Sequence, residues 1–140
     1  MLRQQFFTID ASAPRPGLHD ITDEVARRVD ASDIRDGLLT LFCRHTSASL
    51  LIQENAAPAA RRDLEADFAR IAPENPTTYE HSDEGTDDMP AHLRAALTQT
   101  QLSIPVQAGR MLLGTWQGIF LFEHRREPPP RQLLLHLVGD

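Results

Sequence analysis

The segment Gly109–Arg125, with the sequence GRMLLGTWQGIFLFEHR, carries the strongest structural signal in the chain. Its apolar run ends on Glu-His-Arg at residues 123–125, and a strand that ends on three polar residues usually delivers them to a sheet edge or a pocket. Gly114 and Gly118 allow the backbone to turn tightly beside a large aromatic side chain. Taken alone, Trp116 is most simply explained as a core residue of a β-hairpin. The segment as a whole is too unusual for a hairpin alone, which indicates a function.

The length and composition of the chain indicate a single globular domain over residues 1–140. The hydrophobic fraction of 41% and the charged fraction of 24% are typical of soluble proteins. Apolar runs stay well below the roughly 18 residues that span a bilayer. The segment Met1–Phe7 lacks the long apolar core of a secretion signal. We therefore predict a cytoplasmic protein without a membrane partner.

The charge and the cysteine content exclude several functions. A net charge of −6 argues against nucleic-acid binding, which requires a basic face. All 14 basic residues are arginine, so Schiff-base chemistry on a lysine is excluded. Cys43 is the only cysteine and lies in an apolar run, which favours a buried, inert thiol over a nucleophile.

Periodicity predicts an α+β fold. Short apolar or alternating runs predict strands over 2–10, 37–44, 49–53, 102–107, 111–113, 117–124 and 132–138. Helical spacing predicts helices over 21–29, 59–71 and 90–98. The residues of the two later helices expected to face the core are Leu64, Phe68, Ile71, Leu93, Ala96 and Leu97. Gly17, with prolines on either side of Arg15, predicts a turn after the first strand. The long polar segment 75–88 is expected to be a functional or disordered loop.

The last predicted strand is apolar on both faces. Residues 133–137 read LLLHL, and a single domain of this size has difficulty covering both faces of a sheet. A subunit interface on one face would resolve this.

His45, His81 and His92 form the strongest candidate constellation, with Asp87 and Asp88 close to them in sequence. Neutral imidazole is the usual zinc ligand, and three protein ligands plus water are typical of catalytic zinc. The spacing of these histidines matches no standard zinc motif. Alternatively, His45 is an exposed residue at a strand end and His92 is a first-turn helix residue that bonds to the loop.

The acidic residues of the long loop also allow several interpretations. Asp83, Glu84, Asp87 and Asp88 repel one another unless something neutralises them, although most charge runs are simply solvated. Asp87 or Asp88 could orient a ligating histidine or hold magnesium for a diphosphate. Asp88 could also simply cap the following helix.

Groups suited to bind a phosphate are present elsewhere in the chain: Thr46, Ser47, Ser49, Arg110 and Arg125. Glu54 follows a predicted strand and, with Asn55 as an amide partner, suits general acid–base chemistry. The chain lacks both the Gly-x-x-x-x-Gly-Lys phosphate loop and the Gly-x-Ser-x-Gly elbow of a serine hydrolase.

Three segments together resemble the signature of the YjbQ-like family, whose members are often called secondary thiamine-phosphate synthases. They are HTSASL at 45–50 with Glu54-Asn55, His81 with EGTDDMPAH at 84–92, and GTWQGI at 114–119 followed by EHR at 123–125. The segments occur in the family's order over nearly the whole chain. The resemblance implies a two-sheet β-sandwich that assembles as a homotrimer. One departure is Ala57, which stands where the family pattern Glu-Asn-Ala-Asp-Pro has its aspartate.

The resemblance also implies an activity, the joining of a pyrimidine diphosphate to a thiazole phosphate to give thiamine phosphate and pyrophosphate. The expected catalytic residues are His45, Glu54, Asp88 and His92. The expected ligands of a divalent metal, zinc or magnesium, are His45, His81 and His92. The expected substrate-binding residues are Thr46, Ser47, Ser49, Asn55, Arg110, Thr115, Trp116, Gln117, His124 and Arg125. Two alternatives remain open. One is a metal-dependent hydrolase of a small phosphorylated metabolite, with Glu54 activating water. The other is a non-catalytic trimer that binds a small anionic ligand or another protein.

Overall fold

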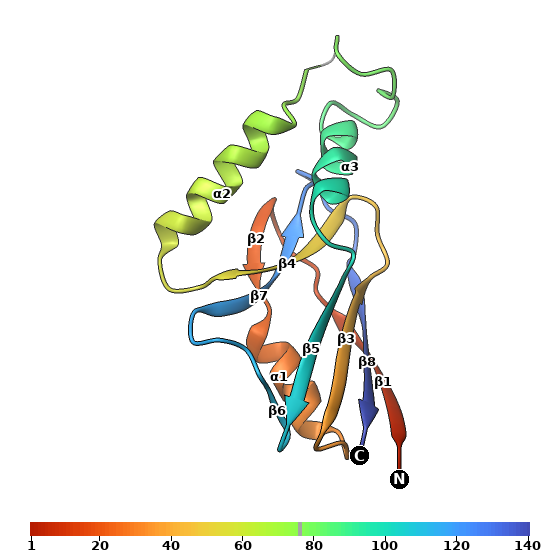
Figure 1. Ribbon diagram of the computed structural model, residues 1–140. Helices are drawn as coiled ribbons and strands as arrows, with labels where there is room; N and C mark the ends of the chain where they lie inside the picture. Colours follow the sequence, from red (N-terminus) through yellow and green to blue (C-terminus); the bar gives the residue numbers. More distant parts are fainter. Residues whose placement is uncertain (76) are drawn as a thin grey trace.

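The computed structural model describes residues 1–75 and 77–140, which form eight strands and three helices (Figure 1). The five-stranded sheet has the order β1-β8-β3-β5-β6, with the bounds Arg3–Asp10, Gln132–Gly139, Gly37–Cys43, Gln101–Gln107 and Arg110–Met111. The three-stranded sheet has the order β2-β7-β4, with the bounds Gly17–Asp20, Gln117–Glu123 and Ala48–Glu54. All strand pairs are antiparallel. The predicted two-sheet α+β fold is confirmed.

The facing sides of the two sheets build one apolar core. Leu39 and Leu41 of β3 and Leu135 of β8 come from the larger sheet, and Leu50 of β4 and Leu121 of β7 come from the smaller one. All five side chains are fully buried. Because alternate residues of a strand point to opposite faces, the apolar runs fix which side of each strand faces inward. Cys43 is buried in the same core, as predicted.

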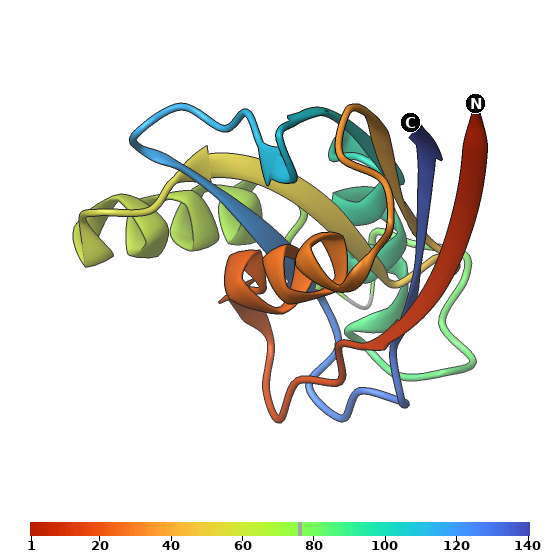
Figure 2. The ribbon, with the colours of Figure 1, turned by 90° about the horizontal axis from the view of Figure 1, so that it is seen from below.

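The helices cover the edges of this core. The helix α1, Thr22–Ala31, crosses the base of the molecule and contributes Val25 and Val29 to the core (Figure 2). The helix α2, Pro58–Ile71, packs Leu64 and Phe68 against apolar residues of β2 and β7. The helix α3, Asp88–Leu97, stands above β3 and β5 in Figure 1. Within the described residues, none of the helices combines the length and the apolar character that a membrane span requires.

Four apolar residues that the sequence analysis places in the core are exposed instead. Trp116 is 63% exposed, Ile71 62% and Leu97 59%, and Ala96 is also exposed. The expected core stripe of α3 is therefore wrong at Ala96 and Leu97, whereas Leu93 is half-buried. The helix turns a different side inward, with the buried residues Asp88, Pro90 and Ala91. The interpretation of Trp116 as a core residue is likewise wrong.

The strand β2 replaces the turn predicted at Gly17. Its four residues pair with β7, with Leu18 opposite Phe122. Gly17 does have the left-handed backbone of a turn residue, with a φ of 121°. Four residues are too few for an alternating pattern to be recognised in the sequence.

The outer face of the five-stranded sheet carries several exposed apolar side chains. Phe6 of β1 and Leu38 and Phe42 of β3 are exposed there, and Leu134 of β8 is half-buried. The ring of Phe6 stacks on that of His136, with the centroids 4.4 Å apart. The sequence-based expectation of two apolar faces around residues 133–137 therefore corresponds to one packed face and one uncovered face.

Candidate functional site

The carboxylate of Asp88 is the centre of a cluster where the first turn of α3 meets the end of β7. Its Oδ2 lies 2.8 Å from Nε2 of His81 and 3.1 Å from Nε2 of His92. Its Oδ1 accepts a hydrogen bond of 2.6 Å from Nη1 of Arg125. Asp88 is buried, whereas both imidazole rings are partly open to solvent. We call His81, Asp88 and His92 the histidine cluster.

The orientation of His92 places one ring nitrogen against a backbone carbonyl and the other against the carboxylate of Asp88. Its Nδ1 lies 2.9 Å from the carbonyl oxygen of Thr46, which can only accept, so Nδ1 carries a proton. In the neutral ring, Nε2 then points a lone pair at Asp88 Oδ2. These lone pairs repel each other unless a proton or a metal ion lies between them. A backbone carbonyl behind the ring is the outer contact typical of metal-binding histidine.

The spacing of the cluster also fits a metal ion. One donor atom each from His81, Asp88 and His92 lies within 4.8 Å of the other two. Two imidazoles and a carboxylate, with room for water on the solvent side, match the donor set of a catalytic zinc site. The structure thus brings two of the predicted metal ligands together and adds Asp88 to them.

His45, the third predicted ligand, makes a different interaction. Its Nε2 accepts a hydrogen bond of 2.9 Å from the backbone N–H of Gln132. Burial and the charge of Arg131 lower the pKa of His45, so the ring is held in its neutral form. His45 instead lines a hollow of about 450 Å³, together with Thr46, His92, Ala95, Ala96 and Thr100.

Arg125 anchors the acidic loop to the end of β7. Its Nε donates to Asp87 Oδ2 at 3.1 Å, its Nη1 to Asp88 and its Nη2 to the carbonyl oxygen of Glu84 at 2.9 Å. Gly85, with a φ of 105°, provides the bend that brings Glu84 back toward this arginine. Of the four acidic residues that the sequence groups together, two therefore pair with one guanidinium group.

The acid strengths of the two aspartates reflect this pairing. Burial alone would raise the pKa of Asp88, but the hydrogen bond from His81 and the charges of His92 and Arg125 outweigh it and lower the pKa. Burial also opposes ionisation of Asp87, and hydrogen bonds from Arg126 N–H and Arg125 reverse its effect, so that this pKa is lowered too. Both carboxylates are therefore charged at neutral pH.

Two of the predicted substrate-binding residues, Ser49 and His124, lie in the interior. Ser49 Oγ lies 2.9 Å from His124 Nε2 and 2.5 Å from Thr98 Oγ1. Burial and the charges of Arg94 and Arg131 lower the pKa of His124 to about 3. His124 Nδ1 finds no hydrogen-bond partner among the residues that the structure describes. This pair is buried, and the bond from Ser49 to Thr98 connects it to the end of α3.

A buried ion pair between Glu123 and Arg131 lies at the same end of β7. The sequence draws attention to Glu123 but not to Arg131. Arg131 donates from Nε and Nη2 to the two carboxylate oxygens of Glu123, and both distances are 2.6 Å. The Nη2 group also donates to Ser47 Oγ at 2.9 Å, so this predicted phosphate-binding hydroxyl is already engaged. Arg131 follows three prolines and carries no motif that would mark it as buried. Its position depends on contacts that only the folded chain makes.

Five further predicted site residues gather at the opposite end of β4 and β7. We call Glu54, Asn55, Thr115, Trp116 and Gln117 the tryptophan end. Asn55 N–H donates to the carbonyl oxygen of Trp116 at 3.0 Å, and Gln117 Oε1 accepts from Gly114 N–H at 2.8 Å. A Cβ atom at position 118 would lie 2.8 Å from Cβ of Asn55, so glycine is required there. These contacts fix the turn and leave the indole of Trp116 exposed.

The histidine cluster and the tryptophan end are far apart within one chain. The strand β4 runs from Ala48 to Glu54 between them, which corresponds to about 20 Å. Figure 1 shows β4 and β7 spanning this distance side by side. Arg110, another predicted phosphate ligand, lies on β6 and makes no contact with either group among the hydrogen bonds of the described residues. The structure thus divides the predicted site into two halves.

Ala57, where the family pattern has aspartate, occupies the N-cap position of α2. Its backbone is extended, with φ and ψ of −103° and 114°, and Pro58 follows as the first helical residue. The Ala57 N–H donates to Glu54 Oε2 at 3.1 Å. An aspartate here would cap the helix, because N-cap carboxylates accept from the free N–H groups of the first turn. Helix capping therefore explains the aspartate of the family pattern without a role in substrate binding.

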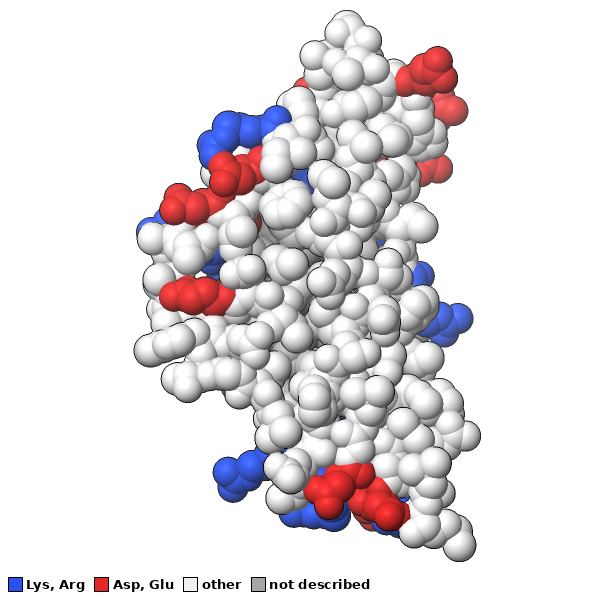
Figure 3. All heavy atoms as spheres, viewed as in Figure 1, with Lys and Arg blue, Asp and Glu red and all other residues white. Residues whose placement is uncertain are grey.

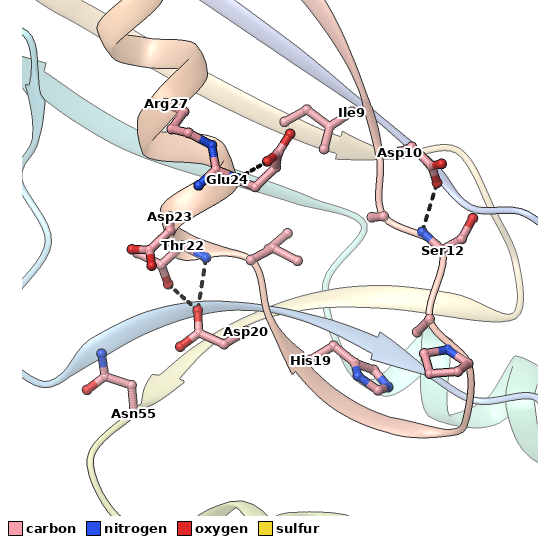
Figure 4. A pocket seen from close by; sticks show the side chains of 14 residues that line it. Ile9, Asp10, Ser12, His19, Asp20, Thr22, Asp23, Glu24, Arg27 and Asn55 are labelled. Carbon is pink, nitrogen blue, oxygen red and sulfur yellow. Dashed lines mark hydrogen bonds and ion pairs between the residues drawn. The ribbon is translucent and has the colours of Figure 1, made fainter.

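A second hollow, of about 690 Å³, lies between the end of β1, β2 and the start of α1. Figure 4 shows Asp10, Asp20 and Glu24 on its walls. Asp20 Oδ1 accepts from both N–H and Oγ1 of Thr22, at 2.9 and 2.6 Å, so this carboxylate ends the strand and begins the helix. Among the predicted site residues only Asn55 reaches this hollow.

Fold and site together define a two-sheet α+β protein with a solvent-accessible cluster of histidine and carboxylate groups. The family described as UPF0047 protein YjbQ-like matches residues 7–140, and the chain belongs to this family. The chain is 50% identical over 123 residues to UPF0047 protein sll1880 of Synechocystis, which covers 88% of this chain and 84% of that protein. It is 43% identical over 134 residues to UPF0047 protein YjbQ of Salmonella typhimurium, with 95% and 96% covered.

Solved structures agree with this assignment. The conserved hypothetical protein TT1486 from Thermus thermophilus superposes with a TM-score of 0.82 at 32% identity, over 94% of this chain and 98% of that one. A YbjQ-like protein from Sulfolobus solfataricus superposes with a TM-score of 0.84 over 100% of this chain and 99% of that one. At 23% identity, the second match supports the fold alone.

Proposed function

We propose that this chain is a metal-dependent transferase for small phosphorylated metabolites, of the type that the YjbQ-like resemblance implies. The proposed reaction joins a pyrimidine diphosphate to a thiazole phosphate. The carbon–oxygen bond to the diphosphate breaks, the thiazole nitrogen bonds to the same carbon, and pyrophosphate leaves. The observation that supports this proposal best is the convergence of His81 Nε2 and His92 Nε2 on one oxygen of Asp88.

A diphosphate leaving group requires positive charge near its oxygens. Arg125 is poorly suited to supply it alone, because Asp87 and Asp88 already neutralise its guanidinium group. A divalent metal held by the histidine cluster would act as a Lewis acid on the phosphate oxygens. In this proposal Arg125 fixes the orientation of Asp88, and Thr46 fixes that of His92.

The donor set favours a transition metal over magnesium. Magnesium prefers oxygen ligands and retains several waters, whereas imidazole suits zinc and its neighbours in the first transition series. With His81 and His92 as two of three ligands, we propose zinc or a similar ion at this position. Magnesium would then arrive with the substrate diphosphate.

The hydrolase alternative requires Glu54 to activate water at the metal. Within one chain Glu54 lies at the other end of β4 from His92, about 20 Å away. This separation disfavours a hydrolase built from a single chain. The homotrimer that the resemblance implies is part of our proposal, and the uncovered apolar face around Phe6 and Phe42 supports an association of copies.

The proposed reaction can be tested directly. The purified protein is incubated with both precursors, magnesium and either zinc or no added metal, and thiamine phosphate and pyrophosphate are quantified. We expect both products in equal amounts, their loss in His92→Ala, and their retention in His19→Ala, since His19 bonds to the Arg15 carbonyl in another part of the molecule. Absence of product with every metal would exclude this reaction.

A further inference from the structure

We infer that the complete site forms between two copies of this chain, with the tryptophan end of one copy seated beside the histidine cluster of another. The inference rests on the proposed function, because it assigns the two halves to two parts of one substrate. The cluster would hold the anionic diphosphate, and the tryptophan end would hold the aromatic ring. The copies meet through two different surfaces, which closes into a ring of subunits.

The first argument is distance. His81, Asp88 and His92, which in the proposed function hold the metal for the diphosphate, contact residues just before β4 and just after β7. The groups suited to an aromatic ring lie at the opposite ends of these strands. About 20 Å of β-sheet separates them, which exceeds the length of a pyrimidine ring with its diphosphate. The core-packed sheet cannot fold to bring its own two ends together.

The second argument is the chemistry of the tryptophan end. The indole of Trp116 is exposed although the turn that carries it is held by several hydrogen bonds. Leu112, four residues earlier, is also exposed. A rigid turn that presents an indole and an apolar side chain to solvent is typical of the central contact in a protein interface. Beside them, the side chains of Asn55 and Gln117 offer amide groups that can recognise ring nitrogens.

The third argument is a matching hollow beside the histidine cluster. Most of its wall is formed by the small side chains of Thr46, Ala95, Ala96 and Thr100, with His45 and His92 at its edge. Its volume of about 450 Å³ can admit an indole ring and leave space next to His92. Exposed Leu97 lies on the same helix, one residue beyond Ala96, so that the apolar side of α3 faces outward.

The charge distribution favours a second copy as the occupant. In Figure 3, charged side chains lie mainly along the margins of the face that carries β3, β5 and α3, and its middle is uncharged. Such a surface offers little to a charged partner and suits association through apolar contacts. The chain itself carries the complementary feature, an exposed indole on a fixed turn.

Cross-linking tests this arrangement without requiring catalysis or metal. Trp116→Cys and Ala96→Cys are prepared as separate variants, mixed, dissociated and reassembled, and treated with a short bis-maleimide linker. We expect a covalent dimer that contains one chain of each variant, whereas each variant alone gives little dimer. Cys43 is buried and should not react. Arg62→Cys, on the exposed side of α2, replaces Trp116→Cys in the control mixture and should give no product with Ala96→Cys.

Three outcomes would overturn the inference. The first is the absence of a mixed dimer. The second is a link within one chain when both substitutions, Trp116→Cys and Ala96→Cys, are made in the same chain, and the third is a monomer by light scattering. If Trp116→Cys does not fold, Thr115→Cys provides the same test from the adjacent residue. Because the linker needs no activity, a positive cross-link with an inactive protein would overturn the reaction while retaining the shared site.

Mixing of inactive variants provides the functional test. His92→Ala and Gln117→Ala each remove one half of the site, and every chain in a mixture then carries one defect. If the site is shared, random assembly of an equal mixture pairs an intact histidine cluster with an intact tryptophan end at about a quarter of the interfaces. We therefore expect the mixture to regain about a quarter of the wild-type activity. A mixture as inactive as its components, with each variant folded and assembled, would place both halves in one chain and contradict the inference.

Discussion

Arg125 Nη1 donates a hydrogen bond of 2.6 Å to Asp88 Oδ1, and this bond connects the residues that follow β7 to the first turn of α3. The same carboxylate faces two imidazole rings through its other oxygen. Asp88 therefore attaches α3 to this region and, in the proposed function, also forms part of the metal site. An arginine behind a ligating carboxylate holds that carboxylate in place for the metal.

Substitution of Asp88 should affect both stability and metal binding. Asp88→Asn preserves the shape but removes the charge that pairs with Arg125, and we expect a loss of roughly 2–3 kcal/mol in the free energy of unfolding. Urea denaturation measures this loss. Asp83→Asn, in the exposed part of the same loop, is the matched control and should change stability by less than about 0.5 kcal/mol. Equal effects of the two variants would show that the buried pairing of Asp88 is energetically unimportant.

The buried His124 should make stability depend on pH. Its pKa in the folded protein is about 3, against about 6.5 for histidine in an unfolded chain. Above about pH 6.5 the ring is neutral in both states. As the pH falls below that value, the unfolded chain takes up a proton that the folded chain does not. The free energy of unfolding should therefore fall by up to about 1.4 kcal/mol per pH unit until the folded pKa is reached.

His124→Gln tests this prediction, since the amide can still bond to Ser49. The difference in stability between wild type and variant, from urea unfolding between about pH 5 and pH 8, should shrink as the solution becomes more acidic. The ring signals of His124 in a nuclear magnetic resonance titration should not move over this range. Ring signals that titrate near the ordinary value for histidine would contradict the prediction.

The ion pair of Glu123 with Arg131 should show strong coupling. Removal of one partner leaves an uncompensated buried charge, so Glu123→Gln and Arg131→Met should each cost about 3–5 kcal/mol. The double variant should cost clearly less than the sum of the two, because no unpaired charge remains. A double-mutant cycle from chemical denaturation measures this coupling. Strict additivity would indicate that the two side chains do not interact in solution.

The N-cap position of α2 offers a stabilising change. Ala57→Asp should raise the free energy of unfolding by about 0.5–2 kcal/mol, because its carboxylate can accept from N–H groups in the first turn of α2. Ala57→Asn caps the helix without a charge close to Glu54 and is the matched comparison. If only the aspartate variant changes activity, the family's carboxylate has a role in the site. If both variants raise the melting temperature with unchanged activity, the role is structural.

The sequence predicts the strands to within one or two residues at most boundaries, because short apolar runs are a direct signal of buried strands. The outward orientation of α3 could not be predicted. Its inward side carries Asp88, and a buried carboxylate becomes favourable only through Arg125, which lies 37 residues further along the chain. Trp116 is exposed because the preceding turn is stabilised by its own hydrogen bonds and does not need the indole in the core.

The candidate site could be predicted in part. The motif around residues 81–92 contains His81, Asp88 and His92, and the fold brings these three side chains together. The sequence also groups His45 with them, but its ring nitrogen is engaged by the backbone of β8. The separation of the tryptophan end follows from the length of β4, a distance that motif spacing does not contain.

The metal content of the purified, tag-free protein tests the central claim most directly. Elemental analysis is made on the wild type, on His92→Ala and on His19→Ala, after gel filtration in a metal-free buffer. The account predicts about one zinc or similar ion per chain in the wild type and in His19→Ala, and almost none in His92→Ala, with all three proteins folded. A wild type without metal that also fails to bind added zinc would contradict the assignment of the histidine cluster as a metal site.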